Sequence, residues 1–179
     1  MGFDKPGLKV YNKPVPILDQ NSLEYFSRST EQTRRLGLRL GTFLKTGKVI
    51  YLSGELGSGK TTLVQGIAQG WGSSDPVTSP TFVLINEYHR PDGETLFHLD
   101  AYRLGSVLDG EELDVDDMLT RGSLVAEWPE NIRAALPENA LMISMRWMAD
   151  EHRGLVISAV GDEYREMLDD IRQQVYGGY

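Results

Sequence analysis

The strongest constraint on the fold is a glycine-rich segment at residues 54–62, which reads GELGSGKTT. An apolar run precedes it at residues 49–52, and residues 62–69 then carry apolar and small side chains at helical spacing, with Gly70 expected to end the helix. A short continuous apolar run is typical of a strand buried on both faces of a parallel sheet. The order of strand, glycine loop and helix therefore predicts an α/β domain.

The glycine-rich segment also predicts a ligand, because it matches the phosphate-binding pattern G-x-x-x-x-G-K-[ST]. Gly54, Gly57 and Gly59 let the backbone wrap closely around an anion, so that successive N–H groups converge on a β-phosphate. Lys60 is expected to reach the β- and γ-oxygens, and the Thr61 hydroxyl to coordinate Mg²⁺. A helix beginning near Gly59 adds the positive end of its dipole. The alternative without a ligand is a glycine-rich turn with a surface lysine, which the flanking strand and helix disfavour.

Two carboxylates are candidates to complete such a site. Asp100 follows an apolar run at residues 96–99, and Glu127 follows another at 124–126. In an open α/β sheet the carboxyl ends of the strands face the phosphate crevice, where a carboxylate can serve Mg²⁺ or orient the attacking group. The spacing does not assign Mg²⁺ binding to one acid and orientation of the attacking group to the other. For each acid, the alternative is a solvated carboxylate at a strand end.

Other polar and aromatic residues near these motifs allow two interpretations each. His98 is interpreted as a core histidine, with a catalytic base as the alternative. Trp128, beside Glu127, offers a stacking surface for a purine or belongs to the core. The hydroxyls around Pro80, including Thr81, stand where nucleotide switches reach a γ-phosphate, or form a simple turn before a strand. No internal arginine finger is evident.

The remaining patterns predict one mixed α/β domain. A turn at residues 91–93 joins two strands into an antiparallel hairpin, so the sheet is mixed although its centre is mainly parallel. We expect a single P-loop NTPase-like domain at residues 23–160, preceded by an irregular leader at 1–22 and followed by a helix and tail at 161–179. The predicted strands are 23–27, 49–52, 82–88, 95–99, 123–126, 141–148 and 154–160, and the predicted helices are 31–45, one beginning near 59, 113–119 and 162–175.

Composition narrows the functional classes. The 179 residues include no cysteine, which excludes disulfide scaffolds, zinc–cysteine sites and thiol catalysis. No apolar run approaches the roughly 20 residues that span a bilayer, and no signal-peptide pattern is present. The net charge is −8, so the surface repels polyanions at long range and unaided nucleic-acid binding is disfavoured. We therefore expect a cytoplasmic protein with no membrane partner.

Four motifs taken together resemble one family. GELGSGKTT at 54–62, SPTF at 79–82, HLDAYRL at 98–104 and EWPE at 127–130 occur in the order typical of the TsaE family, the small bacterial ATPases of tRNA threonylcarbamoyladenosine biosynthesis. The resemblance covers about residues 28–160. It implies a complex with the threonylcarbamoyl-transferase subunit and that subunit's inactive paralogue. It also implies slow ATP hydrolysis in isolation, partner dependence, and contact with tRNA only through the complex that modifies the adenosine next to the anticodon.

The resemblance also implies roles for individual residues. Lys60, Asp100 and Glu127 match the catalytic positions, and Thr61, Asp100 and Glu127 match the Mg²⁺ positions. The nucleotide-binding set comprises Glu55, Leu56, Gly57, Ser58, Gly59, Lys60, Thr61, Thr62, Thr81 and Trp128.

Three other functions share the phosphate-binding pattern. A small-molecule kinase would use the same loop, but no arginine-rich insertion resembles the lid that kinases close over phosphates. A GTPase-type switch is disfavoured, because guanine selection commonly uses an N-K-x-D loop downstream of the phosphate site. Here Asn12-Lys13 lies upstream of that site and is followed by Pro14-Val15. A nucleotide-binding module without turnover stays open, because slow hydrolysis and none look alike in sequence.

Overall fold

The structure, a computed structural model, describes residues 20–78, 84–104 and 113–177. In chain order its elements are β1 (Ser22–Ser27), α1 (Thr30–Phe43), β2 (Val49–Ser53), α2 (Lys60–Trp71), β3 (Ile85–His89), β4 (Thr95–Asp100), α4 (Val115–Arg121), β5 (Gly122–Glu127), the 3-10 helix η1 (Pro129–Ala135), β6 (Ala140–Ala149), β7 (His152–Val160) and α5 (Asp162–Tyr176).

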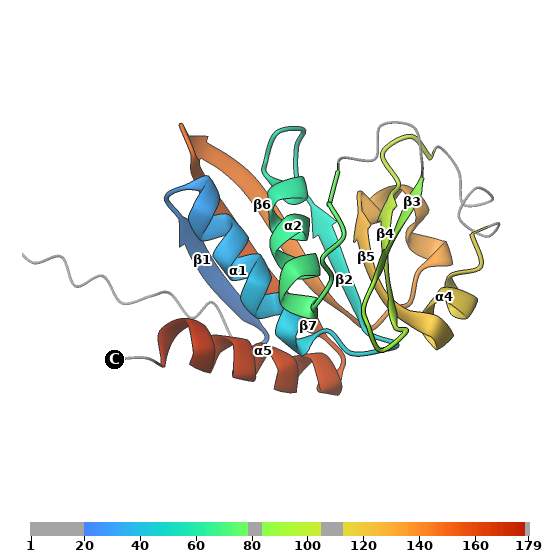
Figure 1. Cartoon of the computed structure of the whole chain (residues 1–179). Coiled ribbons are helices and arrows are strands. Elements are labelled where there is room, and N and C mark those ends of the chain that lie inside the picture. The colour runs from blue at the N-terminus through green and yellow to red at the C-terminus, as the bar shows by residue number, and fades with distance from the viewer. Residues whose placement is uncertain (1–19, 79–83, 105–112, 178–179) are drawn as a thin grey trace, which may run out of the picture.

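The strands form one mixed sheet with a parallel centre. Their order is β1-β7-β6-β2-β5-β4-β3. Strand β2 pairs in parallel with β5 and β6, and β4 pairs in parallel with β5. Both edges are antiparallel, through β1–β7–β6 on one side and the β3–β4 hairpin on the other. The predicted fold class is confirmed, and the loop after β2 emerges at the centre of one end of the sheet (Figure 1).

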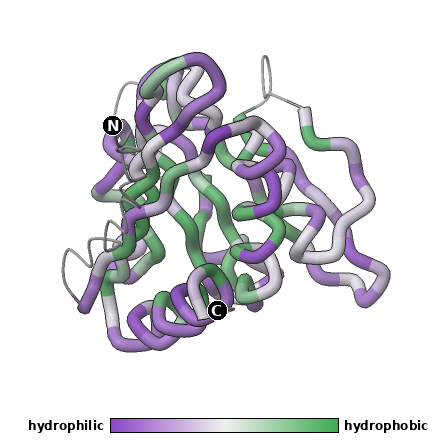
Figure 2. Tube along the Cα trace, turned by 90° about the vertical axis from the view of Figure 1, so that its left-hand side faces the viewer, coloured by the Kyte–Doolittle hydropathy of each residue, from purple (hydrophilic) through white to green (hydrophobic). Residues whose placement is uncertain are grey.

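Helices cover both faces of this sheet, so its central strands are apolar on both sides. Ile50 and Leu52 point into a core shared with α1, α2 and α5, whereas Val49 and Tyr51 on the same strand belong to a second core with α4 and η1. Figure 2 shows the hydrophobic residues gathered along the inner strands and the hydrophilic ones toward the outside. The continuous apolar run that predicted a doubly buried strand thus has the expected environment.

The helix after the glycine loop is longer than predicted. Gly70 was expected to end it, but this prediction is wrong, because α2 continues to Trp71. The residue that ends it is Gly72, which has a φ of 109° and donates its N–H to the carbonyl oxygens of Ala68 and Gln69. Gly70 instead lies where α2 touches α1: a Cβ there would be 1.9 Å from the carbonyl oxygen of Leu38.

The C-terminal helix packs into the main core. Tyr164, Leu168 and Ile171 of α5 are buried in the same cluster as the inner residues of β2 and α2. The Tyr164 hydroxyl accepts a hydrogen bond of 2.9 Å from the N–H of Val49, the first residue of β2. No helix in the described part of the chain is long and apolar enough to span a membrane.

Candidate functional site

The loop between β2 and α2 has the backbone that its glycines predict. Gly54 has a φ of 140°, and a Cβ on it would lie 2.3 Å from the carbonyl oxygen of Met145 on the neighbouring strand β6. Gly59, with a φ of 102°, is the N-cap of α2. Both positions lie in a region of backbone space that favours glycine, and Gly54 also allows β6 to approach the loop closely. The loop therefore ends at the N-terminus of a helix, where unpaired N–H groups can meet an anion.

Lys60 is the first residue of α2 and lies inside the curve of the loop. Its side chain is buried, and Nζ donates hydrogen bonds of 2.6 Å and 3.0 Å to the carbonyl oxygens of Gly54 and Glu55. Burial lowers the pKa of Lys60, and the nearby carboxylates of Glu127 and Asp100 oppose that shift. The ammonium group is thus held within the loop, which is the position that the phosphate-binding pattern predicts for its lysine.

The two predicted acids lie side by side. Asp100 ends β4 and Glu127 ends β5, and these two residues are direct partners in the parallel register of the strands. Glu127 also pairs with Leu52, one residue before the end of β2. Glu127 is buried, whereas Asp100 is partly exposed and accepts a hydrogen bond of 3.0 Å from the N–H of Tyr102. Adjacent strand ends therefore bring both carboxylates to the edge of the sheet from which the glycine loop emerges.

Aromatic side chains flank these acids. Trp128 has a φ of 56°, which turns the chain sharply at the end of β5. Its ring centroid is 4.2 Å from Lys60 Nζ and 5.0 Å from the ring of Tyr102. A cation over an indole face at this distance is an attractive contact. Trp128 therefore lies beside Lys60, and its predicted role in stacking on a purine stays a prediction.

A pocket of about 380 Å³ joins these groups. The predicted residues that line it are Leu56, Gly57, Gly59, Lys60, Thr61, Thr62, Asp100, Glu127 and Trp128, and the remaining two are Tyr102 and Arg153. Ser58 is buried within the loop, and Glu55 is exposed on it. Thr81 and the rest of its SPTF motif fall outside the described residues.

Tyr102 and Arg153 are the pocket residues that the sequence did not predict, and the more distant of the two is Arg153. It comes from β7, almost a hundred positions after the loop, and Nη2 lies 3.4 Å from the carbonyl oxygen of Gly57. Nη1 donates to the carbonyl oxygens of Asp150 and His152, at 3.0 Å each, so the β6–β7 turn holds the guanidinium group. No spacing rule connects a residue of an antiparallel edge pair to a loop in the centre of the sheet, so no sequence signal could have identified it.

The donors available for a metal suit Mg²⁺ held jointly with a phosphate. No group of three or more histidine, cysteine, aspartate or glutamate side chains able to hold a metal occurs in residues 20–78, 84–104 and 113–177. Thr61, Asp100 and Glu127 all line the pocket and offer oxygen ligands, the kind that Mg²⁺ prefers. Since Mg²⁺ in nucleotide sites takes its other ligands from phosphates and water, this set of donors fits such an ion.

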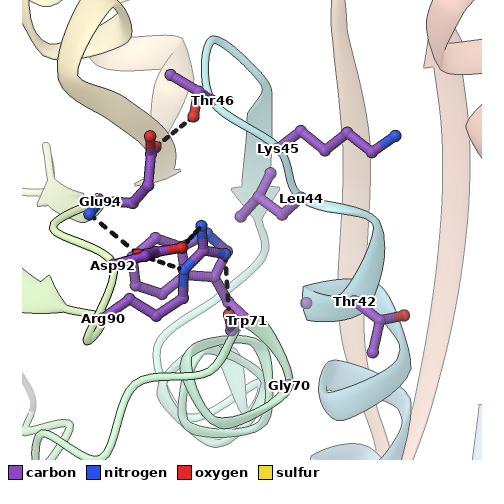
Figure 3. A pocket seen from close by; sticks show the side chains of 10 residues that line it. Thr42, Leu44, Lys45, Thr46, Gly70, Trp71, Arg90, Asp92 and Glu94 are labelled. Carbon is purple, nitrogen blue, oxygen red and sulfur yellow. Dashed lines mark hydrogen bonds and ion pairs between the residues drawn. The ribbon is translucent and has the colours of Figure 1, made fainter.

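A second pocket lies at the other end of β2 and α2 and has no comparable chemistry. It measures about 360 Å³ and is lined by the ends of α1 and α2 and by the β3–β4 hairpin (Figure 3). The charged groups that the hairpin contributes are already paired: Arg90 forms an ion pair of 2.7 Å with Asp92 and lies over the Trp71 ring, and Glu94 accepts a hydrogen bond from Thr46. The pocket beside the glycine loop is therefore the better candidate.

Fold and pocket together define a small α/β protein with a glycine-rich loop of the phosphate-binding type. The family model described as "Threonylcarbamoyl adenosine biosynthesis protein TsaE" matches residues 27–155. The chain belongs to the TsaE family, as the sequence motifs implied.

Relatives and a solved structure agree with this assignment. The tRNA threonylcarbamoyladenosine biosynthesis protein TsaE of Treponema pallidum is 39% identical over 74% of this chain and 97% of its own length. The proteins of the same name from Streptomyces coelicolor and Bacillus subtilis are 41% and 34% identical, over 73% and 83% of this chain and 93% of each relative. The crystal structure of Bacillus subtilis YdiB superposes with a TM-score of 0.74 at 29% identity, covering 86% of this chain and 96% of YdiB.

Proposed function

We propose that this protein binds ATP beside the glycine loop and hydrolyses it with Mg²⁺, in support of threonylcarbamoyl transfer to tRNA. One observation carries the proposal: a buried lysine within the loop and two carboxylates from adjacent strand ends line one pocket. A cation for the terminal phosphates and acids for the metal or the attacking water are the parts that phosphoryl transfer to water needs. The relatives' names supply the pathway.

Lys60 and the loop amides are assigned to the β- and γ-phosphates. Nζ now donates to the carbonyl oxygens of Gly54 and Glu55, which phosphate oxygens would replace as partners. Negative charge that develops on the γ-phosphate during hydrolysis is stabilised by this ammonium group and by the N–H groups at the start of α2. The loop thus acts by position and charge, without forming a covalent bond to the substrate.

Thr61, Asp100 and Glu127 are the residues that would hold Mg²⁺ or orient the attacking water. When bound, the ion neutralises phosphate charge and fixes the geometry of the triphosphate. The more exposed Asp100 and the buried Glu127 are direct partners in neighbouring strands, so one of them can face the metal while the other accepts a proton from water. We assign the water to Glu127, because burial keeps its hydrogen-bond geometry fixed.

The proposed partners are the threonylcarbamoyl-transferase subunit and its inactive paralogue, in the cytoplasm. They are taken from the family resemblance. The acidic surface supports a complex in which the partners contact the tRNA, since a chain of net charge −8 needs other subunits to hold it. Turnover is expected to rise when the partners are added, and co-purification followed by an ATPase assay with and without tRNA measures this.

Two substitutions test the assigned site. Lys60→Ala should weaken Mg·ATP binding by at least about tenfold, because a charge-assisted hydrogen bond is lost. Glu127→Gln should preserve binding but slow hydrolysis about a hundredfold, as expected for loss of a general base. Calorimetry measures the affinity, and single-turnover phosphate release measures the rate.

The control is Lys45→Ala, which removes an exposed lysine at the other end of β2 and should change neither quantity. Full turnover in both site variants would refute the assignment. The same assay separates the alternative functions: a kinase needs an added acceptor for turnover, and a pure binding module shows affinity without phosphate release in any mixture.

A further inference from the structure

A chain of buried hydrogen bonds runs from the β3–β4 hairpin to Glu127. The Nε2 atom of His98 is 2.8 Å from Oε1 of Glu127, and Nδ1 of the same ring is 3.1 Å from the hydroxyl of Tyr88. The exposed fractions of His98, Tyr88 and Glu127 are 0%, 3% and 5%. His98 and Tyr88 do not line the pocket, so their buried polar groups need hydrogen-bond partners within the protein.

The direction of these bonds follows from the protonation states of the three groups. An ionised carboxylate only accepts, so Nε2 of His98 must carry the hydrogen that it shares with Glu127. In a neutral imidazole Nδ1 is then the acceptor, and the Tyr88 hydroxyl donates to it. Burial raises the pKa of Tyr88, so this hydroxyl keeps its proton at all ordinary pH values. With an ionised carboxylate and a neutral imidazole, the donor order is Tyr88 to His98 to Glu127.

Register explains why these groups meet. His98 lies opposite Val125 in the parallel pairing of β4 with β5, two residues before Glu127, and Tyr88 lies opposite Leu96 in the β3–β4 hairpin. Residues two apart on a strand face the same side of the sheet. The three side chains therefore come from three neighbouring strands, and Tyr88 and His98 do not line the pocket.

We propose that His98, fixed by Tyr88, is a positioning residue that holds the Glu127 carboxylate for its work on the attacking water or the metal. The inference rests on the proposed ATP hydrolysis. By occupying Oε1, the imidazole limits rotation of the carboxylate and leaves Oε2 to serve the pocket. A histidine bonded to a carboxylate on one side and held by another group on the other is a common way to set both orientation and tautomer.

Kinetics of matched variants test this role. His98→Leu removes the donor at similar volume and should lower the single-turnover rate about tenfold to a hundredfold, the usual cost of losing a group that orients a ligand. The affinity for Mg·ATP should change less than threefold. His98→Gln places an N–H near the position of Nε2 and should recover most of the rate. Tyr88→Phe should lower the rate about twofold to tenfold, as loss of one hydrogen bond predicts.

Two further variants separate positioning from general stability. Tyr164→Phe also deletes one buried hydroxyl, which bonds to Val49 away from Glu127, and should lower the melting temperature but leave the rate per folded molecule unchanged. In a Glu127→Gln background, adding His98→Leu should cause little further loss, because the group that His98 positions has already been removed. An undiminished additional loss in the double variant would overturn the proposal, as would equal rates in wild type and His98→Leu.

Imidazole NMR on the wild-type chain gives a test that survives any failure of the variants to fold. The sequence has three histidines, so the His98 signals are those that persist when the two exposed histidines are replaced, as His89→Gln and His152→Gln. We expect the Nε2–H tautomer, and the Nδ1–H tautomer would contradict the proposed donor order. If wild type shows no ATP hydrolysis, the proposed function fails while the NMR result still decides the order of the hydrogen bonds.

Discussion

At the scale of single residues, Arg153 is the side chain whose role depends most on where the fold places it. Its guanidinium group is anchored to carbonyl oxygens of the β6–β7 turn, and its Nε lies 3.6 Å from where a Cβ on Gly59 would be. No ion pair to a carboxylate involves Arg153 within the ranges that the structure covers. A cation beside the loop without a counter-charge is suited to an anionic ligand.

We therefore predict that Arg153→Ala weakens Mg·ATP binding about tenfold, the loss expected for one charge-assisted hydrogen bond. Arg146→Ala is the matched control. It removes an exposed arginine from the adjacent strand β6, one register position from the partner of Arg153, and should leave affinity unchanged. Calorimetric titration with Mg·ATP measures both, and equal affinities would show that Arg153 serves only the turn.

At the scale of elements, α1 and α2, the helix that follows the glycine loop, pack with their backbones unusually close together. Glycines of both helices line this contact, and a Cβ on any of them would meet the other backbone: Gly37 at 2.3 Å from the carbonyl oxygen of Leu63, Gly41 at 2.2 Å from that of Ile67, and Gly66 at 2.1 Å from that of Arg34. Real Cβ atoms do not approach backbone atoms so closely. The two helices can pack at this distance only because the side chains are absent.

We predict that Gly70→Ala destabilises the protein although alanine favours a helix by about 1 kcal/mol over glycine. The new methyl group would lie 1.9 Å from the carbonyl oxygen of Leu38, which no side-chain rotation can relieve, so we expect a net loss of about 2 kcal/mol. Urea unfolding measures it. Gln69→Ala, at the exposed neighbouring position, should be neutral or stabilising, and a similar loss there would mean that helix packing is not the cause.

At the scale of the whole molecule, the net charge affects the binding of a nucleic acid and of a single nucleotide differently. The chain carries 18 basic and 26 acidic side chains and a net charge of −8. A field of this sign repels tRNA at long range, whereas the proposed ATP ligand would meet local positive groups such as Lys60 and the start of α2. The acidic surface is thus compatible with a nucleotide site and with a pathway in which other subunits contact the RNA.

We predict that the isolated protein does not bind tRNA at physiological ionic strength. Fluorescence anisotropy of labelled tRNA should stay flat on titration, and lowering the salt should not produce the steep gain in affinity that phosphate contacts cause. Mixing with the transferase subunits should then bring the protein and the tRNA into one complex. Salt-dependent binding by the isolated chain would contradict this and would place a phosphate-binding surface on the protein itself.

The sequence alone located the central strands and most residues of the local site. The loop pattern required glycines at fixed positions, and the observed φ values at Gly54 and Gly59 follow from that local chemistry. The apolar runs located β2, β4 and β5, and the acids at the ends of two of them, Asp100 and Glu127, lie in the pocket because parallel strands end on the same side. These are short-range properties, set by residues close together in the chain.

Tertiary structure decided what depends on neighbours distant in sequence. The strand order and register brought Tyr88 and His98 to Glu127, and the β6–β7 pair brought Arg153 to the loop, although no spacing in the chain relates these residues. Gly70 likewise looked like a helix end, yet packing of α2 on α1 carried the helix past it. The physical reason is common to all three: burial and pairing between elements choose among options that local propensity leaves equal.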